Sequence, residues 1–67
     1  MQSNLLKGIM AEQGVTQTML AEKIGMSKNT LNAKVNGKSS ITVTDIFKIC
    51  EALSITDPVM KCRIFLS

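Results

Sequence analysis

The sequence predicts a compact all-α domain of five short helices, spanning residues 1–67 as a single domain. Apolar residues recur at intervals of three and four, whereas no stretch of convincing length shows the alternation of a strand. Helix-capping residues and glycines stand where these apolar patterns begin and end. The chain has 67 residues and is 45% hydrophobic, which is enough for one folded domain and argues against disorder.

Glycines and hydroxyl side chains delimit the first three predicted helices. The first helix has an apolar stripe formed by Leu5, Leu6, Ile9 and Met10. Gly14 ends that helix as a left-handed cap, and Thr16 caps the second helix, which Gly25 ends. Ser27 caps the third, which closes at Gly37 after Asn36. Hydrophobic-staple spacing supports the second and third starts, through the pairs Val15 with Leu20 and Met26 with Leu31.

The last two predicted helices follow a short loop. Thr42 caps the fourth helix, and Asp45 three residues later completes a capping box. Ile46, Phe47, Ile49, Cys50 and Leu53 give this helix a broad apolar face. Asp57 and Pro58 open the fifth helix as N-cap and first residue. Its apolar side is assigned to Val59, Met60, Ile64 and Phe65.

The segment from Gln17 to Asn36 has the layout of a helix-turn-helix. Two short helical patterns meet at Gly25, and Ala21 lies four residues before it, where two helices must approach closely and turn. The second helix of this motif usually enters the major groove of DNA. The sequence therefore predicts a DNA-binding module.

The distribution of charge agrees with that prediction. The net charge is +3, and no acidic residue lies between Glu22 and Asp45. The basic residues of this stretch are Lys23, Lys28, Lys34 and Lys38. They coincide with the third helix and its following loop, where a phosphate-binding surface is expected. The alternative is a solvated lysine face without a partner.

The third helix supplies the candidate base contacts. Leu31 and Val35 define its buried direction, so Asn29 and Ala33 point most nearly the opposite way. Asn can bond an adenine edge with both amide atoms, and an alanine methyl can pack on a thymine methyl. The alternatives are an exposed polar residue at Asn29 and a default helix former at Ala33.

Two further side chains of this helix are candidate readers. Lys28 lies in the first turn and can reach guanine acceptors or a phosphate, or remain solvated. Asn32 can reach a wall of the groove. We assign the base contacts to Lys28, Asn29, Ala33 and Asn32.

Contacts to the DNA backbone are expected from helix starts and loops, where free amides and the helix dipole favour an anion. The candidates are Gln17, Ser27, Thr30, Asn36, Lys38 and Ser39. Ser27 acts first as a cap, although its hydroxyl can also serve a phosphate. Lys38 can instead complement the dipole of the third helix. These residues would set the position of the protein and not its sequence preference.

From these residues, the chain resembles the Cro/C1-type (XRE) helix-turn-helix family of phage repressors and small bacterial regulators. The matching stretch is TQTMLAEKIGMSKNTLNAKVNGKSSITVTDIFKICEAL. The resemblance implies a five-helix lambda-repressor-like domain that binds operator DNA, often as a two-fold dimer. It implies a phosphate contact for Gln17, base reading by Lys28, Asn29 and Ala33, and backbone contacts for Asn36 and Lys38.

One departure from the family concerns the end of the third helix. Many members have an apolar residue at the position of Lys34 and an acid at that of Val35. Here the apolar residue is Val35, which leaves the rotation of the last turn, and the roles of Ala33 and Lys34, open.

Several classes of function are disfavoured. Histidine and tyrosine are absent, and Cys50 and Cys62 form no metal-binding pair, so we expect no enzyme, metal site or cofactor. The start of the chain lacks the features of a signal peptide, and no apolar run reaches the length of a membrane span. We expect a cytoplasmic protein with two buried thiols, and neither a membrane nor a small-molecule ligand as partner.

The leading hypothesis is a sequence-specific regulator of transcription, most simply a repressor, that binds double-stranded DNA with residues 28–36 and can form a homodimer. The alternative is a protein-interaction module, antitoxin-like or an anti-repressor partner, with the same fold. Ile64, Phe65 and Leu66 motivate it, because they can pack on the core, pair two copies or meet another protein.

Overall fold

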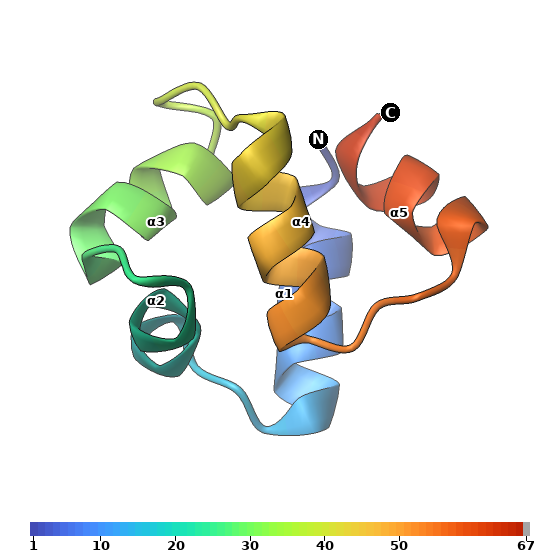
Figure 1. Cartoon of the computed structure of the whole chain (residues 1–67), viewed down its shortest axis with the longest axis horizontal. Coiled ribbons are helices and arrows are strands. Elements are labelled where there is room, and N and C mark those ends of the chain that lie inside the picture. The colour runs from blue at the N-terminus through green and yellow to red at the C-terminus, as the bar shows by residue number, and fades with distance from the viewer. Residues whose placement is uncertain (67) are drawn as a thin grey trace.

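The computed structural model describes residues 1–66, and these residues form five helices packed into one all-α body (Figure 1). The helices are α1 (Ser3–Gln13), α2 (Gln17–Ile24), α3 (Lys28–Val35), α4 (Val43–Ala52) and α5 (Pro58–Phe65). The body measures 28 × 25 × 20 Å along its principal axes. The predicted fold class and the order of the helices are confirmed.

The predicted caps fix where the helices begin. The hydroxyl oxygens of Thr16 and Ser27 accept the backbone N–H of Met19 and Thr30, each at 3.1 Å. Thr42 forms the predicted capping box with Asp45, and Asp57 caps α5. Each such cap stabilises a helix by about 1 kcal/mol, because it satisfies a backbone donor that has no partner inside the helix.

A single apolar cluster joins all five helices. Its most deeply buried side chains are Leu6, Leu20, Leu31, Val35, Ile49, Leu53 and Ile64. The helix-turn-helix pair α2 and α3 packs together, α2 also packs on α4, and α1 packs on α5. The backbone N–H of Gln2 donates to the carbonyl of Ile64 at 2.6 Å, so the two ends of the chain lie side by side (Figure 1).

Three predictions of burial are wrong. Phe47 and Val59 are 64% and 65% exposed, and the thiol of Cys62 is exposed while that of Cys50 is buried. Phe47 follows Ile46 on α4 and lies about 100° around the helix from it, outside the face that meets the core. Val59 and Cys62 of α5 likewise lie well around the helix from buried Ile64, so the core-facing side of both helices is narrower than predicted.

Candidate nucleic-acid interface

The turn between α2 and α3 is made by residues 25–27. Gly25 has a φ of 74°, in the left-handed region that side chains other than glycine rarely adopt. The backbone N–H groups of Gly25 and Met26 both donate to the carbonyl of Ala21, the latter at 3.0 Å. The last turn of α2 is thereby closed, and the chain is redirected into α3 as the helix-turn-helix interpretation requires (Figure 1).

The outward face of α3 leaves two candidate readers free. Leu31 and Val35 are 0% and 1% exposed and fix the buried side of the helix. Lys28 and Asn29 are exposed, and within residues 1–66 neither side chain makes a hydrogen bond. Both are therefore available to a partner at the N-terminal end of α3, the part of a recognition helix that meets base edges.

The other two candidate readers are more constrained. Ala33 is half-buried, and its carbonyl accepts the backbone N–H groups of Lys38 and Ser39. The amide nitrogen of Asn36 donates to the amide oxygen of Asn32 at 2.7 Å. This bond uses one of the two lone pairs of the Asn32 amide oxygen and fixes the orientation of its amide group, while both amide hydrogens stay available to a partner.

The structure brings Lys7, a residue that sequence analysis missed, to the candidate interface. Lys7 lies on α1, and its Nζ donates to the amide oxygen of Asn36 at 3.1 Å across 29 residues of sequence. A basic side chain from α1 thus lies beside the C-terminal end of α3. Hydrophobic spacing on α1 gives no signal for this contact, because it depends on how the two helices pack.

The predicted phosphate contacts fall into two groups at the two ends of α3. At the N-terminal end, the Ser27 hydroxyl donates to Thr30 Oγ1 at 2.8 Å, which leaves the hydroxyl proton of Thr30 for an outside acceptor. Gln17 is the first residue of α2 and half-buried, and its backbone N–H belongs to the first turn, where amides have no partner inside the helix.

The group at the C-terminal end is held by the loop that follows α3. Gly37 has a φ of 77°, which lets the chain reverse and bring two backbone N–H groups to the carbonyl of Ala33. The donors are Lys38 at 2.9 Å and Ser39 at 3.2 Å. The side chains of Lys38 and Ser39 are exposed in this fixed loop.

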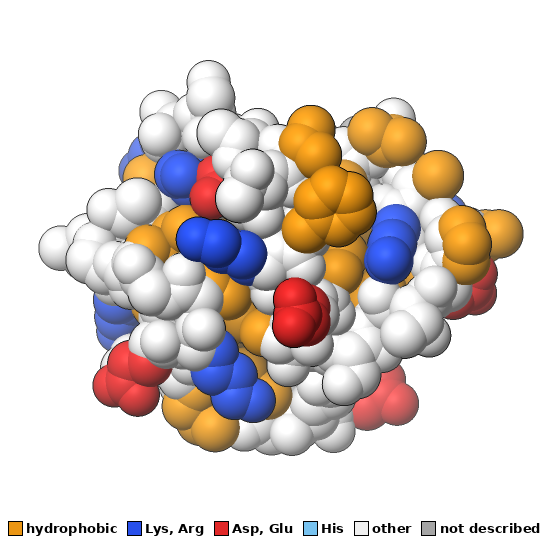
Figure 2. Space-filling model, viewed as in Figure 1, with side chains coloured by type: hydrophobic (Ala, Val, Ile, Leu, Met, Phe, Trp, Pro, Cys, Tyr) orange, Lys and Arg blue, Asp and Glu red, His pale blue; other side chains and the backbone are white. Residues whose placement is uncertain are grey.

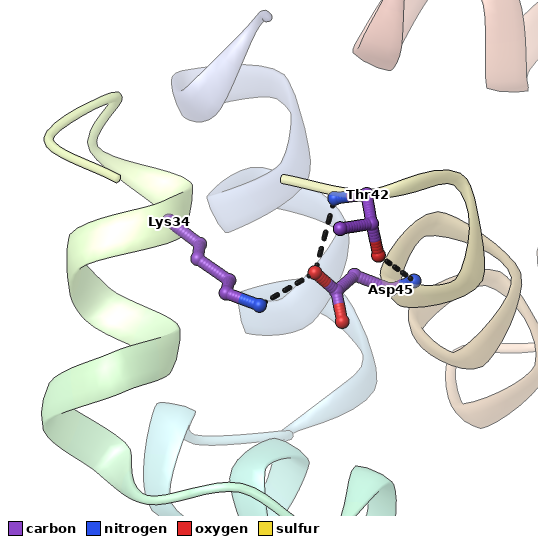
Figure 3. A network of polar contacts seen from close by, with 3 residues as sticks. All are labelled: Lys34, Thr42 and Asp45. Carbon is purple, nitrogen blue, oxygen red and sulfur yellow. Dashed lines mark hydrogen bonds and ion pairs between the residues drawn. The ribbon is translucent and has the colours of Figure 1, made fainter. Parts of the chain in front are cut away.

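Lys34 does not belong to the free basic surface, contrary to the expectation from the acid-free stretch. Its Nζ lies 2.6 Å from Asp45 Oδ2 on α4, with the two side chains 18% and 10% exposed (Figure 3). The same oxygen accepts the backbone N–H of Thr42 at 3.0 Å. The hydrogen bond from Lys34, followed by that from Thr42, holds the pKa of the Asp45 carboxyl below its usual value. The positive charge of Lys34 is neutralised inside the protein.

Features that would suggest a different kind of site are not found in the described part of the chain. Residues 1–66 contain no group of three or more side chains placed to hold a metal ion. None of their helices is long and apolar enough to cross a membrane. A shallow hollow between α2 and α4 is lined by Lys23, Ile24, Lys48, Glu51 and Ala52, away from the outward face of α3.

Comparison with known proteins agrees with this geometry. A family profile described as helix-turn-helix matches residues 6–58, which include both helices of the motif and most of the core. The chain belongs to the Cro/C1-type (XRE) helix-turn-helix family. As a member of this family it is a DNA-binding domain of a type that is typically non-enzymatic.

A curated relative is the antitoxin HipB of Escherichia coli (strain K12). The two sequences are 33% identical over 54 residues, which cover 81% of this chain. The match covers 61% of HipB, so this chain corresponds to only part of that protein's length. No solved structure matches the chain significantly.

Proposed function

We propose that this domain is a sequence-specific, double-stranded DNA-binding regulator of transcription that reads the major groove with residues 28–36 and acts as a repressor in the cytoplasm. The exposed N-terminal half of α3 carries the proposal. There Lys28 and Asn29 are unengaged, on a helix whose opposite side is fixed in the core by Leu31 and Val35.

The chemistry of the exposed side chains suits base edges. The Asn29 amide can bond an adenine through both its donor and its acceptor, and the Lys28 ammonium can bond the acceptors of a guanine. The Ala33 methyl can pack on a thymine methyl, while Asn32 contributes the hydrogens of its side-chain amide. A wrong base at a bidentate contact reduces the free energy of binding by roughly 1–3 kcal/mol, so a few such contacts are enough to distinguish one DNA sequence from another.

The phosphate groups of the DNA would be held on both sides of the reading helix. Gln17, Ser27 and Thr30 face one strand from the N-terminal ends of α2 and α3. Asn36, Lys38 and Ser39 face the backbone from the other end, where Lys7 adds a charge. Contacts of this kind fix the register of a protein on the duplex but do not read its sequence. Two copies on an inverted repeat would double the number of base pairs read.

The first test is selection of bound duplexes from a randomised library at about physiological salt, where non-specific binding is weak. We expect an enriched sequence motif. Replacement of Asn29 by Ala should weaken DNA binding by roughly 1–3 kcal/mol and reduce the base preference at one position of the motif. Val59→Ala, an exposed change on α5 that is outside α3 and outside a hollow between α4 and α5, is the control. Equal affinity and unchanged preference for the Asn29 variant would remove that residue from the base contacts.

A protein-interaction module is the second candidate, favoured by the similarity to a protein named as an antitoxin. In that case the outward face of α3 would be of secondary importance, and an apolar surface elsewhere would bind another protein. Failure of the folded domain to enrich any DNA sequence would favour this function over the first.

A further inference from the structure

Three exposed asparagines lie along α3 and its C-cap. Asn29, Asn32 and Asn36 are separated by three and four residues, so they share one side of the helix. In the view of Figure 2, most of the surface over α3 consists of uncharged side chains and backbone, with lysines around it. An amide side chain has an acceptor on one arm and donors on the other, so what it recognises depends on which arm faces the partner.

A chain of hydrogen bonds sets the orientation of two of these amides. Lys7 of α1 donates from Nζ to Oδ1 of Asn36 at 3.1 Å, and Nδ2 of Asn36 donates to Oδ1 of Asn32 at 2.7 Å. A lysine ammonium has donors and no acceptor, so it can meet only the oxygen of the Asn36 amide. The nitrogen of Asn36 is thereby turned to Asn32, where it can meet only an oxygen. The direction of the whole chain of bonds follows from the ammonium at its start.

A second contact fixes the start of α1 against the end of α3. The hydroxyl of Ser3 donates to the carbonyl of Val35, the residue before Asn36. Ser3 and Lys7 are four residues apart, so both lie on the side of α1 that meets α3. Lys7 is half-buried. Because α1 is anchored at this point, Lys7 approaches Asn36 from a fixed position.

Asn32 and Asn29 consequently differ in what they present to a partner. The two arms of an amide diverge from one carbon, so turning the oxygen of Asn32 to Asn36 turns its nitrogen and both hydrogens away from Asn36. The side chain of Asn29 makes no hydrogen bond within residues 1–66 and can offer its oxygen and nitrogen together.

The bases differ in the same terms. In the major groove, adenine offers an acceptor beside a donor, guanine offers two acceptors, thymine offers one acceptor, and cytosine offers only a donor. A free amide such as that of Asn29 therefore suits adenine. An amide that presents hydrogens alone suits guanine or thymine and has nothing to bond on cytosine.

We propose that Lys7 and Asn36 are positioning residues for base recognition, and that through them Asn32 selects a base with acceptors, guanine or thymine, against cytosine. This assignment rests on the proposed function and deepens it, because it states what one side chain of α3 reads and why. A basic residue of α1 would then contribute to sequence preference as well as to affinity.

The test is selection of bound duplexes with the full chain, and its readout is the base preference at each position of the enriched motif. Asn32→Ala identifies the position that depends on Asn32, where the wild type should enrich guanine or thymine. Lys7→Met removes the donor that orients the Asn36 amide. The discrimination against cytosine at that position should then fall roughly 2–10-fold, the range for one hydrogen bond between neutral groups.

Two further lysine variants separate orientation from charge. Lys7→Arg keeps a side chain that only donates and should keep the preference. Lys23→Met is the matched control for loss of one positive charge, because Lys23 is exposed and lines the hollow between α2 and α4. Loss of a charge that only contacts phosphate weakens binding to all sequences alike. Lys23→Met should therefore leave the base preference unchanged.

Asn36→Asp tests the direction of the chain of bonds. This isosteric change places an oxygen where Nδ2 stands, while the other oxygen can still accept from Lys7. Asn32 must then donate to the new acceptor, which turns its own oxygen outward. The preference at its position should move from guanine or thymine toward cytosine. None of the substituted side chains is buried, so circular dichroism should show the wild-type helix content in every variant.

The outcomes distinguish this assignment from the proposed function. No position that responds to Asn32→Ala, or the same base preference in the wild type, Lys7→Met and Asn36→Asp, would overturn the assignment. That would hold even if all affinities fell together, because a uniform loss is the effect of a phosphate contact alone. No enriched motif for the folded wild type would instead overturn the proposed function, and this assignment with it.

Discussion

Replacing Asp45 by Ala tests the contact that joins α3 to α4. One carboxylate oxygen accepts both the Lys34 ammonium and the backbone N–H of Thr42 (Figure 3). The substitution removes half of a capping box and leaves a half-buried ammonium without its partner. We therefore expect α4 to fray at its start and α3 to lose a contact at its C-terminal turn.

The magnitude follows from these two losses. A helix cap contributes about 1 kcal/mol, and a hydrogen bond to a charged group about 1.5–3 kcal/mol. Lys34 is 18% exposed and can turn its ammonium to water, which offsets part of the loss. The expected cost is about 2–3 kcal/mol, a large share of the roughly 3–10 kcal/mol typical of a domain this size. At about 4–8 °C per kcal/mol, the midpoint of thermal unfolding should fall by roughly 10–20 °C.

The assay is urea unfolding followed by circular dichroism at neutral pH, with Asp45→Asn and Lys34→Met as companion variants. Asp45→Asn keeps an acceptor for Thr42 but loses the charge, so it should cost about 1–2 kcal/mol. The double variant Asp45→Ala with Lys34→Met should lower the free energy of unfolding by less than the sum of the two single changes, because both single changes remove the same contact. A cost for Asp45→Ala within about 0.5 kcal/mol of zero, as for an ordinary surface change, would refute the coupling of α3 to α4.

Three further predictions concern pH, salt and backbone conformation. The pKa of Asp45 is lowered from an ordinary value near 3.8. The contribution of its carboxylate to the free energy of unfolding is therefore complete above that pH and is lost as pH falls through the lower pKa of the folded state. Acid unfolding of the wild type should show this loss, whereas that of Asp45→Asn should not. Lys38→Met should reduce the salt dependence of DNA binding by about one phosphate contact, measured by titration at several salt concentrations, whereas Lys34→Met should leave it unchanged because Asp45 already neutralises that charge. Gly25→Ala should cost about 1–2 kcal/mol in thermal unfolding, because an added Cβ meets no neighbour but φ is +74°. Gly8→Ala in the middle of α1, where a Cβ also meets nothing, should instead stabilise by about 0.5–1 kcal/mol, and equal effects of the two changes would contradict the conformational reason.

Helix boundaries could be predicted from the sequence because they depend on local chemistry. Thr16, Ser27 and Thr42 each accept a backbone N–H three residues later, and Gly14 and Gly25 both have positive φ. Such interactions involve neighbouring residues and the intrinsic freedom of glycine, so their signals lie in short stretches of sequence.

Contacts between helices could not be predicted in the same way. Lys34 and Asp45 are 11 residues apart, and Lys7 and Asn36 are 29 apart. Whether a lysine points into solvent or reaches a neighbouring helix depends on the angle at which the helices pack. The same uncertainty explains Phe47, which is as hydrophobic as its buried neighbours but faces away from them. The sequence gives the type of each side chain, whereas the packing of the helices decides whether that side chain points to the core, to a neighbouring helix or to solvent.

The two lysine contacts together change the expected origin of DNA affinity. Sequence alone placed the basic surface within one acid-free stretch, but Lys34 of that stretch is neutralised by α4, and Lys7 of α1 lies beside Asn36 instead. The positive charge is therefore divided between the two ends of α3, with Lys28 at its N-terminal end and Lys7 and Lys38 at its C-terminal end. Because few lysines contribute, we expect non-specific attraction to the backbone to be modest, so that under the proposed function discrimination depends mainly on the polar side chains of α3.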